Sequence, residues 1–136
     1  MMITVETIIE APIHKVWDAW TNPEHIVQWN YASDDWHCPK AAVDLTPGGL
    51  FSYEMKAKDG SMGFDFTGLY DDVIEHKMIT YRMSDGRAVE IRFELLDGKV
   101  KLSESFEAEG SDSDEMQRAG WQCILVNFKN YVEALM

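Results

Sequence analysis

The chain has 136 residues, 46% of them hydrophobic and 26% charged, which fits one globular domain over residues 1–136. Twelve Lys and Arg residues against 24 Asp and Glu residues give a net charge of −12, which repels phosphate backbones and anionic lipids. We therefore expect no nucleic-acid partner and no membrane partner. No basic segment precedes Glu6, and no stretch approaches the roughly 20 apolar residues of a membrane span, so we expect a cytoplasmic protein.

The first forty residues predict one strand, two short helices and a loop. Apolar and polar residues alternate over residues 3–10, the period of a half-buried strand. Residues 13–20 place apolar side chains at three- and four-residue spacing, which indicates an amphipathic helix. Asn22, followed by proline and glutamate, is typical of an N-cap and predicts a second helix over 23–29. Residues 30–39 lack periodicity, and we expect a loop there.

The rest of the chain predicts an antiparallel meander that ends in a long helix. Turn signals such as Asp59-Gly60 separate stretches that alternate between apolar and polar residues. Gly68, inside the longest stretch, indicates a bulge or bend. A polar segment precedes the helix, with Ser111 or Ser113 as its N-cap. The expected strands cover 40–46, 50–58, 62–75, 78–83, 87–96 and 99–107, and the helix runs from about 114 to 135.

This order of elements predicts an α+β fold. A curved seven-stranded antiparallel sheet would wrap around the long C-terminal helix, with two short helices after the first strand. Such a sheet curves enough that one helix need not fill its concave side. A small apolar ligand would then sit in the gap between sheet and helix.

Several motifs are spread over the whole chain. They are the segment 9–24 with Ala11-Pro12, Val16-Trp17 and Pro23-Glu24, then Trp29, the turn Pro47-Gly48-Gly49-Leu50-Phe51, and Gly120-Trp121. These motifs resemble those of the START-like helix-grip (SRPBCC) superfamily, in the branch of activator-of-heat-shock-ATPase homologues. The resemblance implies a helix-grip fold, binding of lipids, sterols, polyketides or other hydrophobic molecules, and enzymatic activity in a few members. One eukaryotic branch stimulates a chaperone's ATPase as part of a larger protein.

Inward-facing aromatic residues are the candidates for the wall of a ligand cavity, because they give a flat apolar ligand a large contact area. The alternative is that the same residues simply fill a core. The expected wall consists of Trp29, Tyr53, Phe64, Phe66, Tyr70, Tyr81, Trp121 and Leu125.

Two charged residues are candidates for polar anchors inside the cavity. Asp65 or Arg92 would serve if its side chain pointed inward, because a buried charge needs a partner. The alternative for Arg92 is a solvated ion pair with Glu90 or Glu94 on the same strand face.

The sequence gives no reason to expect a metal or another cofactor. Asp34, Asp35, His37 and Cys38 are close in sequence, but zinc ligands normally come in pairs spaced two to four residues apart, so we expect a surface loop. The chain has no Gly-x-Ser-x-Gly, P-loop or Gly-x-Gly-x-x-Gly motif. We expect Cys38 and Cys123 to be reduced, with Cys123 as a small core residue.

Non-enzymatic binding of a small hydrophobic or aromatic molecule is the function that these patterns favour. A cochaperone-like or regulatory module, whose acidic surface meets a chaperone or another basic partner, is the first alternative. A cyclase-like or hydrolase-like enzyme is the second, and it would need a buried acid with a raised pKa, for which Asp65 is the candidate. The oligomeric state stays open, with a homodimer through an exposed strand edge as one option.

Overall fold

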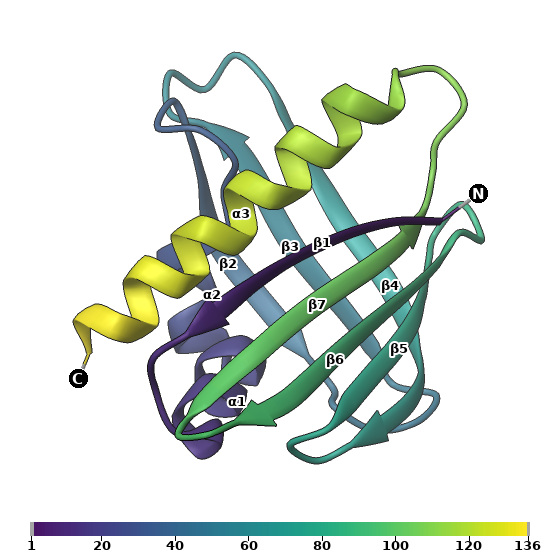
Figure 1. The fold of residues 1–136 in the computed structure, drawn as a ribbon. Coiled ribbons are helices and arrows are strands. Elements are labelled where there is room, and N and C mark those ends of the chain that lie inside the picture. Colours follow the sequence, from purple (N-terminus) through teal and green to yellow (C-terminus); the bar gives the residue numbers. More distant parts are fainter. Residues whose placement is uncertain (1, 136) are drawn as a thin grey trace.

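The computed structural model describes residues 2–135 and has the expected α+β helix-grip architecture. A curled seven-stranded antiparallel sheet holds a long helix against its concave side, and two short helices lie at one end (Figure 1). None of the helices in the described part of the chain is long and apolar enough to cross a membrane. The elements are β1 (Met2–Ile9), α1 (Ile13–Thr21), α2 (Pro23–Trp29), β2 (Trp36–Val43), β3 (Leu50–Ala57), β4 (Gly63–Ile74), β5 (Met78–Met83), β6 (Ala88–Leu96), β7 (Lys99–Glu107) and α3 (Asp114–Ala134).

The sheet follows the predicted meander. Its strand order is β1-β7-β6-β5-β4-β3-β2, so each strand from β2 to β7 pairs with the next one in the chain, and β1 adds to the far edge beside β7. Most expected strand and helix ends agree with the structure to within two residues. The predicted caps also form, with the Asn22 side chain accepting a hydrogen bond from Glu24 N and the Ser113 side chain one from Met116 N. Period-two and period-3.6 patterns therefore predicted most of the fold.

The expected loop over 30–39 is wrong in its second half. Trp36 and His37 pair with β3, and β2 begins at Trp36 rather than at Lys40. The register shifts between His37 and Lys40, where Pro39 has no N–H group to donate to a neighbouring strand. This irregularity breaks the alternation of apolar and polar residues, which explains why the strand was missed.

The two cysteines exchange their expected environments. Cys38 is buried and donates a hydrogen bond from Sγ to Lys40 O, and burial raises the pKa of its thiol to about 11. Cys123, expected in the core, is exposed on α3. It lies on the outer side of a helix whose buried positions include Leu125, Phe128 and Val132, so the apolar stripe of α3 bypasses it.

The C-terminal half of α3 packs against α1 and α2 over a filled core, which we call the sealed core. Phe128 lies at its centre, with the Trp20 ring 4.9 Å away and the Trp29 ring 4.8 Å away. Aromatic pairs at these separations stabilise a core beyond the area that they bury. The sealed core comprises Val16, Trp17, Phe93, Leu125, Phe128 and Val132, with Trp20 and Trp29 at its border.

A histidine joins the three helices at the surface of the sealed core. His25 on α2 places Nδ1 2.6 Å from the Tyr131 hydroxyl on α3 and Nε2 3.2 Å from Asp18 Oδ2 on α1. This contact fixes the C-terminal half of α3 on the short helices.

Gly68 is required by packing, and it does not mark the bulge of β4. The irregularity lies between Tyr70 and Asp72, two residues further along. A Cβ atom at Gly68 would lie 2.4 Å from Cε2 of Phe51, so only glycine lets the Phe51 ring lie against the strand. Phe51 in turn contacts the rings of Tyr53 and Tyr81. Gly68 thus fixes the aromatic layer on the inner face of the sheet.

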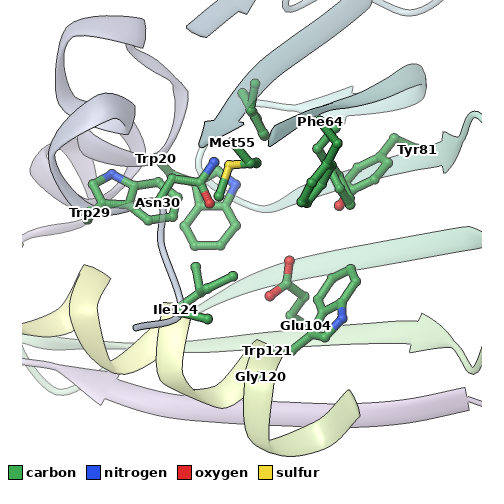
Figure 2. A pocket seen from close by; sticks show the side chains of 13 residues that line it. Trp20, Trp29, Asn30, Met55, Phe64, Tyr81, Glu104, Gly120, Trp121 and Ile124 are labelled. Carbon is green, nitrogen blue, oxygen red and sulfur yellow. The ribbon is translucent and has the colours of Figure 1, made fainter. Parts of the chain in front are cut away.

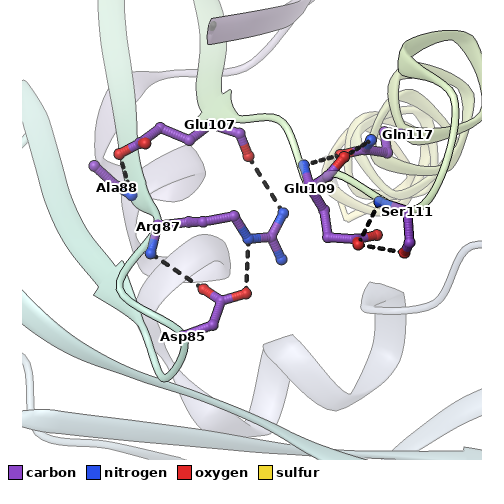
Figure 3. A network of polar contacts seen from close by, with 7 residues as sticks. All are labelled: Asp85, Arg87, Ala88, Glu107, Glu109, Ser111 and Gln117. Atoms are coloured by element: carbon purple, nitrogen blue, oxygen red, sulfur yellow. Dashed lines mark hydrogen bonds and ion pairs between the residues drawn. The ribbon is translucent and has the colours of Figure 1, made fainter.

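A polar network sets the position of the N-terminal half of α3 (Figure 3). The buried Gln117 side chain accepts from Glu109 N at 2.7 Å and donates to Glu109 O at 2.8 Å and to Asp112 O at 3.0 Å. These bonds satisfy the backbone of the segment between β7 and α3. Arg87 extends the network, because it donates to Asp85 Oδ2 and to Glu107 O at the end of β7. The start of α3 is therefore tied to the β5–β6 turn.

Candidate functional site

A cavity of about 280 Å³ lies between the N-terminal half of α3 and the inner face of the sheet (Figure 2). This volume is close to the lower end of the range of about 300–1,000 Å³ that is typical of small-molecule sites. Strands β3, β4, β5 and β7, all three helices and the segment after α2 supply its wall. The lining residues are Trp20, Trp29, Asn30, Ala32, Tyr53, Met55, Phe64, Phe66, Tyr81, Glu104, Gly120, Trp121 and Ile124.

The strands supply wall residues at alternate positions, as period-two geometry requires. Tyr53 and Met55 come from β3, and Phe64 and Phe66 come from β4. The Tyr53 and Phe66 rings lie nearly parallel, at an interplanar angle of 5° and with centroids 6.2 Å apart. Phe64 is 56% exposed and lies near the start of β4, so it lies at the rim of the cavity. Two adjacent strands thus present a continuous aromatic surface.

Helix α3 covers the cavity with one large residue and one glycine. The Trp121 ring stacks on Phe106 of β7 at 4.0 Å and meets the edge of Phe66 on β4 at 6.3 Å, so it spans the sheet. Next to it, a Cβ atom built at Gly120 finds no atom within 4 Å. The missing side chain of Gly120 therefore leaves space that any larger residue would occupy.

Glu104 is the charged residue of the cavity wall. It lies on the inner face of β7 between Leu102 and Phe106 and is only 5% exposed. Its partners on the neighbouring strands are Val5 of β1 and Ile91 of β6, both buried. Within residues 2–135 no hydrogen bond and no ion pair reaches its carboxylate. The residues next to Glu104 on the inner face of β7, and those opposite it on β1 and β6, are thus all apolar.

Burial raises the pKa of Glu104 from its ordinary value of 4.5 to about 8, because desolvation penalises the charged form and no neighbouring cation or donor offsets it. No fully enclosed side-chain nitrogen or oxygen in residues 2–135 lacks a partner, so the Glu104 oxygens retain contact with the open space of the cavity. Figure 2 shows the carboxyl group pointing into that space. Glu104 can therefore donate a hydrogen bond when neutral or receive a cation when charged.

The tyrosines that face Glu104 add polarity without charge. Burial raises the pKa of Tyr53 and of Tyr81 well above the usual range, and the nearby Glu104 charge adds to both shifts. Their hydroxyls therefore stay neutral at physiological pH, where they offer hydrogen bonds to a polar group of a ligand. Chemically, the cavity has aromatic walls that carry the Glu104 carboxyl group, the hydroxyl groups of Tyr53 and Tyr81 and the side-chain amide of Asn30.

The structure brings six of the eight expected wall residues together around the cavity: Trp29, Tyr53, Phe64, Phe66, Tyr81 and Trp121. Tyr70 and Leu125 are buried without lining it. Tyr70 packs behind the wall on Phe51 and Tyr81, with centroids 5.2 Å and 6.4 Å away, and Leu125 belongs to the sealed core. Contact of the six residues with a ligand stays a prediction.

The two expected polar anchors do not point into the cavity. Asp65 is exposed, because its neighbours Phe64 and Phe66 take the inward positions of β4. Arg92 is exposed on the outer face of β6 and pairs with Glu90, the alternative that the sequence left open. The alternation along each strand sends both side chains to solvent. Glu104 takes the place that these two residues were expected to fill.

Sequence reasoning missed Glu104 although a signal for it was present. Along β7, the inner positions are Val100, Leu102, Glu104 and Phe106, so one acid interrupts an apolar face. Acidic residues are rarely buried, because burial of a charge costs free energy. An acid at a core position of a strand therefore indicates a functional role. Trp20, Asn30, Ala32 and Ile124 were also missed as wall residues, because no periodicity distinguishes lining a cavity from filling a core.

The segment with the closely spaced Asp34, Asp35, His37 and Cys38 is no metal centre in the described structure. Within residues 2–135, no three His, Cys, Asp or Glu side chains lie close enough to hold a metal ion. Asp35 instead accepts a hydrogen bond from Ser33 at 2.6 Å, while Cys38 is turned into the protein.

A curled sheet that grips a long helix over an aromatic cavity defines the class of START-like helix-grip proteins. The family model described as "Activator of Hsp90 ATPase homolog 1-like protein" matches residues 10–133. The chain therefore belongs to this family, as its motifs indicated. No functionally curated protein matches the chain.

Solved structures share the fold over the whole length. An AHSA1-like protein from Aeromonas hydrophila is 47% identical, with a TM-score of 0.94 over 99% of this chain and 94% of that one. A protein from Cytophaga hutchinsonii is also 47% identical, with a TM-score of 0.85 over 98% and 92% of the two chains. A protein from Nitrosomonas europaea has a TM-score of 0.87 over 100% and 96% at 17% identity, which shows the fold alone.

Proposed function

We propose that this protein binds one small aromatic or hydrophobic molecule, without transforming it, in the cavity beneath the N-terminal half of α3. The observation that carries the proposal is a cavity of about 280 Å³ with aromatic walls between the sheet and α3. Empty apolar space costs contacts that a ligand would restore, and flat aromatic walls favour a flat ligand. The volume suits a molecule of one or two fused rings.

Gly120 supports the same proposal from the helix side. Glycine in a helix interior costs roughly 0.5–1 kcal/mol relative to alanine. Nothing within 4 Å blocks a side chain at this position, so packing does not require the glycine. What the glycine preserves is the open space beside Trp121. The loss of helix stability that Gly120 causes is explained if that space holds a ligand.

Native mass spectrometry gives the first test. We expect freshly purified protein to carry an additional small mass that is lost under denaturing conditions, or to take up one equivalent of added 1-naphthalenemethanol. A second test titrates 1-naphthalenemethanol by calorimetry into the wild type and Gly120→Leu, in which leucine would fill the cavity. We expect one saturable site in the wild type and an affinity at least tenfold lower in Gly120→Leu.

Ala119→Leu is the matched control, because it adds a leucine at the preceding, exposed position of α3. It should bind as the wild type does. Equal binding by Gly120→Leu and the wild type would place the ligand outside the cavity and contradict the proposal. Failure of the wild type to bind, together with a mass free of additions, would contradict it as well.

A regulatory contact with a basic protein is the second candidate. The net charge of −12 and the description of the matching family, an activator of a chaperone ATPase, favour it. Charge-driven association weakens with salt. We expect a purified Hsp90-type chaperone to bind at low ionic strength and to be released at high ionic strength. No binding at low ionic strength would exclude this candidate.

A further inference from the structure

The carboxyl group of Glu104 is the most selective feature of the cavity. Its flanking residues on the sheet are Val5, Ile91, Leu102 and Phe106, all apolar. The helix above supplies Trp121 and Ile124, which are also uncharged. Tyr53 and Tyr81 face Glu104 from β3 and β5, and burial keeps both neutral. Within residues 2–135, no lysine, arginine or histidine lines the cavity. Among these residues, the charge that the cavity can present is therefore negative and has no partner.

Burial of a carboxyl group without a partner costs free energy of folding, and the packing of the apolar face does not require such a group. A leucine or valine at this strand position would continue the apolar face of β7 and remove the desolvation penalty. A partner within a bound ligand would offset the penalty instead. The raised pKa of Glu104, at about 8, shows how poorly the protein alone supports the charged form.

The walls around Glu104 favour a cationic partner. Trp20, Trp29 and Trp121 line the same cavity as Tyr53 and Tyr81, and the faces of such rings attract cations. The net charge of −12 raises the local concentration of cations around the whole molecule and repels anions. The shape of the cavity, the chemistry of its rings and its charge therefore all favour a cationic aromatic ligand.

We propose that the ligand of this cavity carries a basic nitrogen, which lies against the Glu104 carboxylate while its aromatic body fills the space between the walls. This inference rests on the proposed function, because it needs the cavity to be a ligand site. It narrows the ligand to aromatic amines, amidines or basic heteroaromatic compounds. Anionic ligands such as fatty acids and aromatic acids are disfavoured by the same carboxylate.

The test uses three ligands with one ring system: 1-naphthylmethylamine, 1-naphthalenemethanol and 1-naphthoate. Calorimetry at pH 7 measures each with the wild type, Glu104→Gln and Glu94→Gln. Glu94 is the matched control because it lies exposed on β6 and its substitution makes the same chemical change, from a carboxyl group to an amide, away from the cavity. Thermal unfolding of each variant shows that it is folded; we expect Glu104→Gln to be at least as stable as the wild type.

We expect the wild type to bind the amine at least tenfold more tightly than the alcohol, and 1-naphthoate least tightly. Glu104→Gln should lose at least tenfold in affinity for the amine and change less than twofold for the alcohol, and Glu94→Gln should match the wild type. Because Glu104 starts mostly protonated, amine binding should also release most of one proton, measurable in buffers of different ionisation enthalpy.

The outcomes separate this inference from the proposed function. If alcohol and amine bind the wild type equally, the cavity is a ligand site but the inference about the basic nitrogen fails. If Glu104→Gln keeps the preference for the amine, the overall charge causes it and the role of Glu104 is overturned. If amine binding releases no proton, the nitrogen lies away from Glu104. If none of the three compounds binds, the inference fails together with the proposed site.

Discussion

The two halves of the space beneath α3 are built from the same sheet and the same helix, yet one is filled and the other is hollow. In the sealed core, Leu125, Phe128 and Val132 meet α1 and α2 with no exposed surface. In the hollow half, Gly120 and Trp121 face the sheet across about 280 Å³, and an acid replaces an apolar residue on β7. The filled half therefore buries apolar side chains against one another, whereas the hollow half leaves a cavity beside a carboxyl group without a partner.

This division has a physical cause in how α3 is held at its two ends. At the C-terminal end, His25 joins the helix to α1 and α2 through Tyr131 and Asp18. At the N-terminal end, Gln117 and the segment around Glu109 hold it to the end of β7. Between these supports, the side chains of Arg118 and Gln122 donate to Thr4 O and Glu6 O of β1, so the helix is held along one edge of the sheet and the cavity lies beside this contact.

Removal of one aromatic ring from each half should give the largest difference in stability between the two halves. Phe128 has no exposed surface, so Phe128→Ala should cost about 3–5 kcal/mol of the free energy of unfolding. Phe64→Ala, at the 56% exposed rim of the cavity, should cost less than about 1 kcal/mol. Urea denaturation measures both. Equal losses would show that the hollow half is packed as tightly as the sealed core.

Glu104 should make stability depend on pH in a way that the sealed core does not. Its folded-state pKa of about 8 exceeds its ordinary value of 4.5, so the native state holds a proton that the unfolded chain releases. The contribution of Glu104 to the free energy of unfolding is therefore most favourable below pH 4.5. It falls as pH rises towards 8, by up to about 1.4 kcal/mol per pH unit. Above pH 8 the penalty is complete and constant.

Glu104→Gln removes this titration and should be more stable than the wild type at pH 8, with the difference shrinking as pH falls towards 4.5. Unfolding by urea at a series of pH values measures the difference. Glu94→Gln, with the same replacement of a carboxyl group by an amide at an exposed position, should follow the wild-type curve in shape. Parallel curves for Glu104→Gln and the wild type would mean that Glu104 is not buried as the structure shows.

A smaller change should come from the support at the start of α3. Gln117→Ala removes three hydrogen bonds to Glu109 and Asp112 and should cost about 1–3 kcal/mol of stability. It should also weaken binding of 1-naphthalenemethanol, because the helix above the cavity loses its anchor. Gln122→Ala, which removes one bond to Glu6 O, is the control on the same helix. Unchanged affinity of Gln117→Ala for 1-naphthalenemethanol would show that ligand binding in the cavity does not depend on the hydrogen bonds of Gln117.

The fold followed from the sequence because period-two and period-3.6 patterns state which side of an element is buried. They predicted α3 and most strands but missed the start of β2, where the irregularity between His37 and Lys40 breaks the alternation. The same patterns placed Trp121, Tyr53 and Phe66 inward. Whether inward residues touch or leave a gap depends on the height of α3 above the sheet. Contacts far apart in the sequence help to set this height, such as those of Arg118 with Thr4 O and of Gln122 with Glu6 O.

Proton contacts between ligand and protein test the ligand site most directly. Intermolecular nuclear Overhauser effects report which methyl groups lie near the ring protons of bound 1-naphthalenemethanol. We expect contacts to the methyl groups of Met55 and Ile124, which line the cavity, and none to Leu125 or Val132 in the sealed core. Contacts confined to the exposed Leu50 and Leu95, or none at saturating ligand, would contradict binding in the cavity.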